Sequence, residues 1–352
     1  MKGIILHGGH GTRLRPLTHT GPKQLLPIAN KPMSQYCIES LIDAGVTDIA
    51  IIIGGIGSDK VKEFYGDGEK FGVKFTYFQQ DFPKGISHAI NLCKEFIGKE
   101  KFIVFLGDNI IQKSIKKYVN EFINSNVAAS LLLCEVPNPS SFGIAELKDN
   151  EIMKIIEKPK NPKSNLAVTG IYFLTPIIFE IIADLKPSWR NELEITDALD
   201  KLLENDYKIT YHMITDYWKD TGTPEDVLHA NKEILEKIKG NFQGQKDNES
   251  LVNENSVVGE GTIIKGNSKI SNSVIIGKNC LIDNSCIGQY TSLGDNTKIS
   301  FTNIENSIIM DDCTIEGEML IKNSIIAKNS HISSQKNLEK IFLLGEGTKI
   351  IL

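Results

Sequence analysis

The chain has 352 residues, a formal net charge of −5 at pH 7, 41% hydrophobic residues and 24% charged residues. These values are typical of a globular protein, and the length favours two domains over one. The negative charge argues against a nucleic-acid polymer as partner, since proteins that bind one usually present a basic face. The sequence has no apolar run of 18 residues, and its apolar start, KGIIL, is too short for a signal peptide. We therefore expect a cytoplasmic protein that does not enter a membrane.

Short apolar runs alternate with helical patterns in the first part of the chain. Strands that alternate with helices imply a parallel sheet with helices on both faces. Between residues 127 and 174, closely spaced apolar segments predict further, antiparallel strands, so the expected fold is an α/β domain with a Rossmann-like mixed sheet. The predicted strands of the first part are 2–6, 48–53, 74–79 and 102–106, and the predicted helices are 33–44, 58–65 and 85–96.

A polar, glycine-containing stretch, 240–250, separates this part from one with a different texture. We place the domain boundary there, which gives a first domain at 1–240 and a second domain at 241–352. In the second domain one aliphatic residue recurs about every six positions, which is typical of a hexapeptide-repeat left-handed parallel β-helix of about five turns. The aliphatic positions are Val258, Ile264, Ile270, Ile276, Ile282, Ile287, Leu293, Ile299, Ile309, Ile315, Ile326 and Ile332. Mostly small side chains follow four residues later: Thr262, Ser268, Val274, Cys280, Cys286, Thr291, Thr297, Cys313 and Ser330.

Glycines follow the first predicted strand in LHGGHGTRLRPLT, residues 6–18, with a spacing that fits neither a Walker loop nor GxGxxG. Glycines let backbone N–H groups approach an anion, and Arg13, Arg15 and Lys23 come next. Only three of the 39 lysine and arginine residues are arginines, the third being Arg190. Arginine grips phosphate oxygens with two N–H groups, whereas lysine offers a point charge. We infer a triphosphate site at this loop; a tight turn with solvated arginines is the alternative.

Two aspartates are candidate magnesium ligands, Asp108 in FLGDN and Asp220 in YWKDTGTPED. Mg²⁺ prefers a few carboxylates together with phosphate oxygens. The alternative for each aspartate is an ordinary helix cap or turn. Glu157 and Lys158, in IEKPK, are candidates too, although they would also fit an exposed strand end. The six scattered cysteines are interpreted as small buried hydrophobic residues.

Seven segments occur in one order along the chain: GGHGTRLRPLT…PKQLLPIANKPM, LGDN, FGIAEL, EKP, SNLAVTGIYF, NELEITDAL and WKDTGTPEDVL. Together they resemble the sugar-nucleotide pyrophosphorylases, a nucleotidyltransferase family. The resemblance is closest to the long form of glucose-1-phosphate thymidylyltransferase, which carries a C-terminal left-handed β-helix. It covers nearly the whole chain and implies a Mg²⁺-dependent transfer of a nucleoside monophosphate from dTTP or UTP to glucose 1-phosphate, with release of pyrophosphate.

The resemblance also implies roles for particular residues. The catalytic residues would be Arg13, Lys23, Asp108 and Asp220, and the two aspartates would hold the metal. The nucleotide would contact Leu6, Gly8, Gly9, Gly11, Thr12, Arg13, Lys23, Gln24, Gln80, Gly85 and Asp108, with the two glutamines on the base. The sugar phosphate would contact Asn109, Gly143, Glu157, Lys158, Val168, Tyr172, Arg190 and Trp218.

The sequence departs from the family pattern at a few positions. His7 stands where the family usually has alanine, and it could add a pH-dependent charge beside the triphosphate or pack as a neutral ring. KGISHA, residues 84–89, resembles the thymidylyl pattern only in part, so thymine and uracil both stay open. Asn191 stands where glycine is usual.

Two other functions fit parts of the sequence. Some relatives carry an acyltransferase on the β-helix that uses a histidine, and His331 is the only histidine beyond residue 229. Similar two-domain chains serve as regulatory subunits without catalysis, but those would be expected to lose the phosphate and metal residues.

Hexapeptide coils often associate through their flat faces, so we also expect a homo-oligomer.

Overall fold

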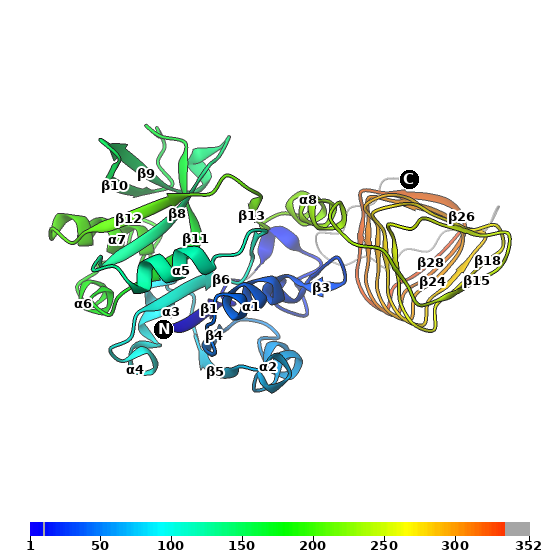
Figure 1. Cartoon of the computed structure of the whole chain (residues 1–352), viewed down its shortest axis with the longest axis horizontal. Helices are drawn as coiled ribbons and strands as arrows, with labels where there is room; N and C mark the ends of the chain where they lie inside the picture. The colour runs from blue at the N-terminus through cyan, green and yellow to red at the C-terminus, as the bar shows by residue number, and fades with distance from the viewer. Residues whose placement is uncertain (10, 335–352) are drawn as a thin grey trace. The chain divides into compact units, whose positions relative to one another are not determined.

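The computed structural model describes residues 1–9 and 11–334, and the chain separates into two compact units (Figure 1). The first comprises Met1–His10, Thr20–Leu25 and Met33–Asp220. The second comprises Gly11–His19, Leu26–Pro32 and the residues from Thr221 on. Two short N-terminal segments therefore belong with the C-terminal part of the chain.

The first unit is built on a nine-stranded mixed sheet with the order β10-β9-β11-β6-β1-β4-β5, to which β8 and β12 are added through β11. β6, β1, β4 and β5 are parallel, and β11 pairs antiparallel with β6. The four strands predicted for the first part of the chain are confirmed. The sheet consists of β1 (Lys2–Leu6), β4 (Asp48–Ile53), β5 (Lys74–Gln79), β6 (Phe102–Leu106), β8 (Ala129–Glu135), β9 (Gly143–Lys148), β10 (Glu151–Glu157), β11 (Leu166–Leu174) and β12 (Ile209–Met213).

Helices cover both faces of this sheet (Figure 1). Successive side chains of a strand point to opposite faces, so Ile4 joins one core cluster and Ile5 the other. Strands buried on both faces read as continuous apolar runs, which is why they stood out in the sequence. The helices of the first unit are α1 (Met33–Asp43), α2 (Asp59–Tyr65), α3 (Ile86–Asn91), α4 (Lys94–Ile97), α5 (Lys116–Ile123), α6 (Ile178–Ala183) and α7 (Ile195–Glu204), with 3₁₀ turns at Lys23–Leu25, Glu69–Phe71 and Pro139–Ser141.

The single helix predicted over 85–96 is wrong, because the chain breaks into α3 and α4. Cys93 has φ −94° and ψ 8°, outside the α region, and its N–H bonds to the carbonyl of Ile90, three residues back. The Cys93 side chain is fully buried there. An apolar pattern that continues through the break gives no sign of it.

The pairing of β1 with β6 sets the place of the predicted site. Leu6 lies opposite Leu106 in register, and Gly107 donates its N–H to the carbonyl of Leu6 at 2.9 Å. The glycines after β1 and Asp108 after β6 therefore leave the sheet side by side, at the carboxyl ends of parallel strands. A small two-stranded sheet follows, in which β7 (Asn109–Ile111) pairs antiparallel with β13 (Trp218–Asp220).

The second unit contains a left-handed parallel β-helix, as predicted, together with α8 (Pro224–Leu235), the hairpin of β2 (Pro27–Ile28) with β3 (Lys31–Pro32), and a 3₁₀ turn at Thr12–Leu14. Up to residue 334, one stack of the coil holds six strands. Its first strand begins at Asn241, inside the stretch expected to separate the domains. The domain division at residue 240 stays a prediction. The coil strands are β14 (Asn241–Phe242), β15 (Gln245–Lys246), β16 (Leu251–Val252), β17 (Val257–Val258), β18 (Ile263–Lys265), β19 (Lys269–Ile270), β20 (Ile275–Ile276), β21 (Leu281–Asp283), β22 (Cys286–Ile287), β23 (Ser292–Leu293), β24 (Lys298–Glu305), β25 (Ile308–Ile309), β26 (Thr314–Lys322), β27 (Ile325–Ile326) and β28 (His331–Ser333).

The interior of the coil follows the predicted six-residue period. The aliphatic residues from Val258 to Ile315 form its buried core, and Ile326 and Ile332 pack against it. One predicted small partner is wrong, because Ser285 rather than Cys286 is buried. In the coil the inward-facing small residue stands two positions before each aliphatic residue. Because Ile287 follows Ile282 by five positions instead of six, its small partner is Ser285.

Two further sequence expectations concern membranes and cysteines. Among the helices that the structure describes, none is long and apolar enough to cross a membrane. All six cysteines carry free thiols, and Cys37, Cys93, Cys280 and Cys313 are buried as expected. Cys134 and Cys286 are only partly buried.

Candidate active site

The loop after β1 brings glycines to the carboxyl edge of the sheet. Gly9 has φ +98°, a conformation that favours glycine, and a Cβ at this position would meet no atom within 4 Å among the described residues. A Cβ on Gly8 would lie 3.4 Å from Oε1 of Gln80, which comes from the end of β5. Gln24 donates from Nε2 to the carbonyl of Gly8 at 3.0 Å. The loop therefore lies against both glutamines that the family resemblance assigns to the base.

Lys23 and Asp108 form an ion pair that is largely shielded from solvent, beside this loop. Lys23 Nζ contacts Oδ2 of Asp108, and their side chains are only 12% and 14% exposed. Burial alone would raise the pKa of Asp108, but the charge and hydrogen bond of Lys23 outweigh it and hold the pKa below the usual range. Asp108 is therefore a carboxylate at neutral pH, with a cation already beside it.

Asn109 connects the two aspartates predicted to hold magnesium. In the β7–β13 pair, Asp220 lies opposite Asn109, the neighbour of Asp108. The buried Asn109 donates from Nδ2 to Oδ1 of Asp108 at 3.0 Å. Its Oδ1 accepts from Nε1 of Trp218 at 2.8 Å and from the N–H of Gly170 at 3.2 Å. Asn109 and Trp218 thus orient Asp108; direct contact of either with a sugar stays a prediction.

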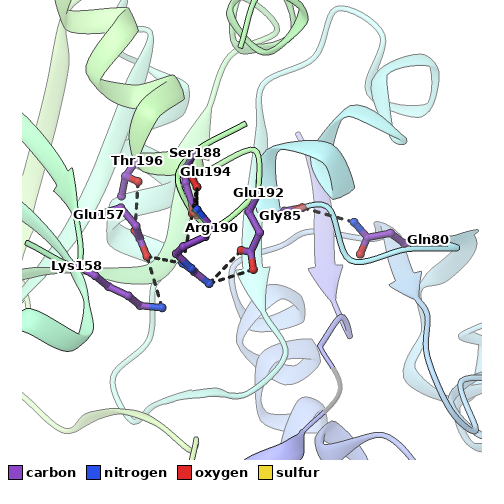
Figure 2. Close-up of polar contacts among 9 residues, drawn as sticks. All are labelled: Gln80, Gly85, Glu157, Lys158, Ser188, Arg190, Glu192, Glu194 and Thr196. Atoms are coloured by element: carbon purple, nitrogen blue, oxygen red, sulfur yellow. Dashed lines mark hydrogen bonds and ion pairs between the residues drawn. The ribbon is translucent and has the colours of Figure 1, made fainter. Parts of the chain in front are cut away.

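Arg190 lies among carboxylates contributed by β10 and by the segment before α7 (Figure 2). Its Nη1 is 3.1 Å from Oε1 of Glu157 and 3.3 Å from Oε1 of Glu194, and its Nη2 is 3.1 Å from Glu192. Lys158 Nζ lies 3.7 Å from Oε1 of Glu157. Glu157 and Lys158, which are adjacent in sequence, are thus brought together with the distant Arg190; their contact with a sugar phosphate stays a prediction.

A second set of contacts fixes the Glu157 side chain. Thr196 donates from Oγ1 to Oε2 of Glu157 at 3.2 Å. A Cβ on Gly143 would lie 2.6 Å from Cγ2 of Thr196 and 3.3 Å from Oε2 of Glu157, so this position requires glycine. Burial and the charge of Glu194 raise the pKa of Glu157 above its usual value, against the lowering effect of Lys158 and Arg190.

A tight turn presents Arg190 to these carboxylates. Ser188 donates its N–H to the carbonyl of Glu192, and Asn191 donates its N–H to the carbonyl of Ser188, both at 2.8 Å. Asn191 has φ +60°, which asparagine tolerates better than most residues, so it can replace the glycine usual in the family. Ser188 Oγ also bonds to Oε1 of Glu194 at 2.9 Å. The turn leaves Trp189 83% exposed.

The remaining predicted residues of the first unit are placed as follows. Gln80 bonds through Nε2 to the carbonyl of Gly85 at 3.5 Å and lies 2.9 Å from Nδ1 of His88. Gly85 has φ +98°, and a Cβ there would lie 2.4 Å from the carbonyl oxygen of Leu193. The close approach of the Leu193 backbone therefore explains why glycine is needed at this position, without a bound base. Val168 and Tyr172 are buried in β11. Burial raises the pKa of Tyr172, and the charges of Glu157, Asp108 and Asp220 raise it further.

Gly11, Thr12 and Arg13 belong to the second unit. Gly11 adopts φ +58° ahead of the 3₁₀ turn, and Thr18 donates from Oγ1 to its carbonyl at 2.8 Å. The guanidinium of Arg13 lies close to Gly222, where a Cβ would be 2.9 Å from Nη2. Gly222, just before α8, is thus a residue that sequence reasoning missed.

His7 is a buried neutral ring. Its side chain is 1% exposed, it packs edge-on against Tyr65, and burial lowers its pKa to about 3 despite the charge of Asp108. Neither ring nitrogen has a hydrogen-bond partner among the described residues. The interpretation of His7 as a packed neutral ring is supported.

Glu192, Glu194 and Thr196 were missed as individual residues, although the motif NELEITDAL contained them.

Comparison with known proteins agrees with this arrangement. Residues 2–237 match the nucleotidyl transferase family, and residues 283–351 match the GMPPB C-terminal domain. The chain belongs to the nucleotidyl transferase family.

Among its relatives, the low-salt glycan biosynthesis nucleotidyltransferase Agl11 of Haloferax volcanii is 47% identical over 237 residues, which are 67% of this chain and 66% of the relative. The glucose-1-phosphate thymidylyltransferase of Streptomyces antibioticus is 43% identical over 261 residues, 74% of this chain and 73% of the relative. A Bacillus anthracis structure assigned as a glucose-1-phosphate thymidylyltransferase, in complex with sucrose, superposes with a TM-score of 0.64 at 43% identity. That match covers 69% of this chain and 97% of the other.

Proposed function

We propose that this chain is a sugar-1-phosphate nucleotidyltransferase that transfers a nucleoside monophosphate from dTTP or UTP to glucose 1-phosphate and releases pyrophosphate. The observation that carries the proposal is the cluster of Glu157, Lys158 and Arg190 (Figure 2), which Gly143 also adjoins. Three separate segments contribute to this cluster, which combines two cations with a partly buried carboxylate. Such a set suits a ligand with both a phosphate and hydroxyl groups.

Gln24 supports a base whose ring N–H can donate a hydrogen bond, as in thymine and uracil. Its Nε2 is held by the carbonyl of Gly8, which orients the amide, and its buried Oε1 has no hydrogen-bond partner among the described residues. A buried acceptor is costly to leave without a donor. The ring N–H of thymine or uracil is a donor, whereas cytosine and adenine offer only acceptors on the corresponding ring nitrogen. This supports dTTP or UTP over CTP and ATP.

The chemistry that follows needs no general base. An oxygen of the sugar 1-phosphate attacks the α-phosphorus of the triphosphate, the bond to the bridging oxygen breaks, and pyrophosphate leaves with the electron pair. A phosphate monoester is already largely ionised at pH 7, because its second pKa is about 6. Catalysis then consists of positioning and charge neutralisation. Arg13, Lys23, Lys158 and Arg190 supply the cations.

Asp108 and Asp220 fit a magnesium site that is completed by substrate. The β7–β13 register brings their backbones to neighbouring positions, and Asp108 is ionised. In residues 1–9 and 11–334, no group of three or more His, Cys, Asp or Glu side chains is placed to hold a metal by itself. Mg²⁺ commonly takes one or two carboxylates with phosphate oxygens, and when bound it would neutralise charge on the triphosphate.

The alternative functions have less support. His331, the candidate for a β-helix acyltransferase, lies in the short outer strand β28 and is exposed. A regulatory subunit would have no use for a buried Lys23–Asp108 pair beside the glycine loop.

We also propose a cytoplasmic location, where nucleoside triphosphates are available, and a homo-oligomer. Exposed Leu251, Ile263 and Leu320 on the coil support self-association.

A substrate matrix tests the proposal. Pyrophosphate release should be measured for dTTP, UTP, CTP, ATP and GTP against glucose 1-phosphate, galactose 1-phosphate and N-acetylglucosamine 1-phosphate, with magnesium. The proposal expects turnover with dTTP or UTP and glucose 1-phosphate as the best pair. Preference for CTP or ATP would contradict the role of Gln24, and no release from any pair would contradict the function.

A further inference from the structure

Asn231, in the middle of α8, joins three separate parts of the second unit. It is fully buried, and its Oδ1 accepts from the N–H of Ala29 at 2.8 Å and from Oγ of Ser292 at 2.7 Å. Its Nδ2 donates to the carbonyl of Tyr290 at 2.9 Å. Asn231 thus bonds the turn of the β2–β3 hairpin and a rung of the β-helix to the same helix.

The hairpin also bonds to the coil directly. Asn30 donates from Nδ2 to the carbonyl of Leu293 at 2.5 Å. Ala29 and Asn30 form the two-residue turn with φ +47° and +58°, a left-handed conformation that is unfavourable for alanine. A strained turn persists only when its surroundings hold it. Here the bonds from Asn231 and to Leu293 do so.

The other end of α8 lies against the arginine of the glycine loop. Gly222 packs under the guanidinium of Arg13, two residues before the helix begins. Thr223 and Asp226 form a capping box that fixes this end of the helix. A capped helix is stiff over its 12 residues, so an anchor at its centre also restrains its first turn.

We propose that Asn231 is a positioning residue through which the β-helix fixes α8, and with it Gly222 and Arg13, in the arrangement that binds the nucleotide. The inference rests on the proposed function, because Arg13 is assigned to the triphosphate there. It makes the coil part of the nucleotide-binding machinery. The sugar-phosphate cluster around Arg190 belongs to the first unit and has no part in this network.

The test compares Asn231→Ala and Ser292→Ala with Thr291→Ala in the full chain. Thr291, next to Ser292, is also fully buried in the coil, but its Oγ1 has no hydrogen-bond partner among the described residues. Thr291→Ala therefore perturbs the same rung without touching Asn231. Kinetics should be run with each substrate varied in turn, at a temperature well below the Tm of every variant.

We expect Asn231→Ala to raise KM for the nucleotide about tenfold, since it removes bonds of about 1.4 kcal/mol or more in total, which corresponds to that factor. Ser292→Ala should raise it about threefold, and Thr291→Ala should leave it within twofold of wild type. KM for glucose 1-phosphate should move less than twofold in all three. Parallel increases in both KM values, or equal effects of Ser292→Ala and Thr291→Ala, would overturn the proposal.

Hydrogen exchange provides a readout that does not depend on activity. In Asn231→Ala, backbone amides of 11–19 and 26–32 should exchange at least tenfold faster, while those of 188–193 should be unchanged. Unchanged exchange in 11–19 would overturn the positioning role. If wild type lacks nucleotidyltransferase activity but exchange responds as expected, the proposed function fails and the structural coupling stands.

Discussion

The guanidinium of Arg190 lies 3.1 Å from Oε1 of Glu157, a residue 33 positions earlier in the chain. Glu192 and Glu194 contact the same guanidinium, so three carboxylates surround one arginine. They orient its fork, and a phosphate that binds Arg190 must compete with them. Another side chain with the same charge, such as lysine, would therefore not substitute for Arg190.

Arg190→Lys should therefore be a severe substitution. Lysine keeps the charge but lacks the planar fork of N–H groups. It therefore cannot contact Glu157, Glu192 and a phosphate at the same time. We expect kcat/KM for glucose 1-phosphate to fall by about tenfold to a hundredfold, since a charge-assisted hydrogen bond contributes about 1.5–3 kcal/mol. KM for the nucleotide should hardly change. Steady-state kinetics with each substrate varied will measure both, and wild-type behaviour toward glucose 1-phosphate would show that Arg190 does not bind it.

Asp108→Asn should abolish turnover while the fold persists. Asparagine has nearly the same shape and can still accept from Lys23, but it lacks the charge needed to hold magnesium. Asp216→Asn is the matched control, because Asp216 pairs with Lys113 on a more exposed surface. We expect at least a hundredfold loss for the first variant, normal activity for the second, and unchanged far-UV circular dichroism for both. Near-normal turnover of Asp108→Asn at saturating magnesium would remove Asp108 from the metal site.

His7 should make the first unit sensitive to acid. Its pKa is about 3 in the folded chain against 6.5 when unfolded, so its stabilising effect is complete above pH 6.5 and is lost as the pH falls toward 3. Between pH 6.5 and 5, wild type should lose about 1.5 kcal/mol of unfolding free energy more than His7→Ala does.

Urea unfolding in EDTA, followed by the fluorescence of Trp189 and Trp218, measures this effect in the first unit. His7→Phe is the control for packing, because it keeps a ring that cannot titrate and should show the same shallow pH dependence as His7→Ala. Three parallel pH profiles would mean that the His7 ring is protonated in the folded protein.

A fragment of residues 1–240 tests whether the first domain binds the nucleotide as well without the β-helix. It retains every residue assigned to the substrates, but it lacks Tyr290, Ser292 and Leu293, which hold Asn231 and Asn30. We expect a folded fragment that binds dTTP at least tenfold more weakly than the full chain in isothermal titration. Equal affinity would show that the catalytic domain needs no support from the β-helix.

Much of the fold could be predicted because its signals are local. Strands β1, β4 and β6 are buried on both faces and read as apolar runs, and the coil repeats one aliphatic residue about every six positions. The break at Cys93 could not be predicted, since it depends on a backbone conformation that the apolar pattern does not record. The inward place of Ser285 required knowing which neighbour of the aliphatic points into the coil.

Part of the candidate site could be predicted from residue types that have few other uses, and the rest only from the family resemblance. Scarce arginines and the aspartates after strands singled out Arg13, Arg190, Asp108 and Asp220. The residues that orient them were not distinctive. Asn109, Gly222 and Asn231 contact residues far along the chain, and an asparagine or glycine alone does not reveal such partners.

The fate of the α-phosphorus tests directly whether the protein transfers a nucleoside monophosphate to a sugar phosphate. With dTTP labelled at that position, glucose 1-phosphate and magnesium, we predict that the label enters dTDP-glucose in step with pyrophosphate release, and only when the sugar phosphate is present. UTP should give UDP-glucose if uracil is the preferred base. Label recovered as the free nucleoside monophosphate, or no incorporation with either nucleotide by folded protein, would contradict the account.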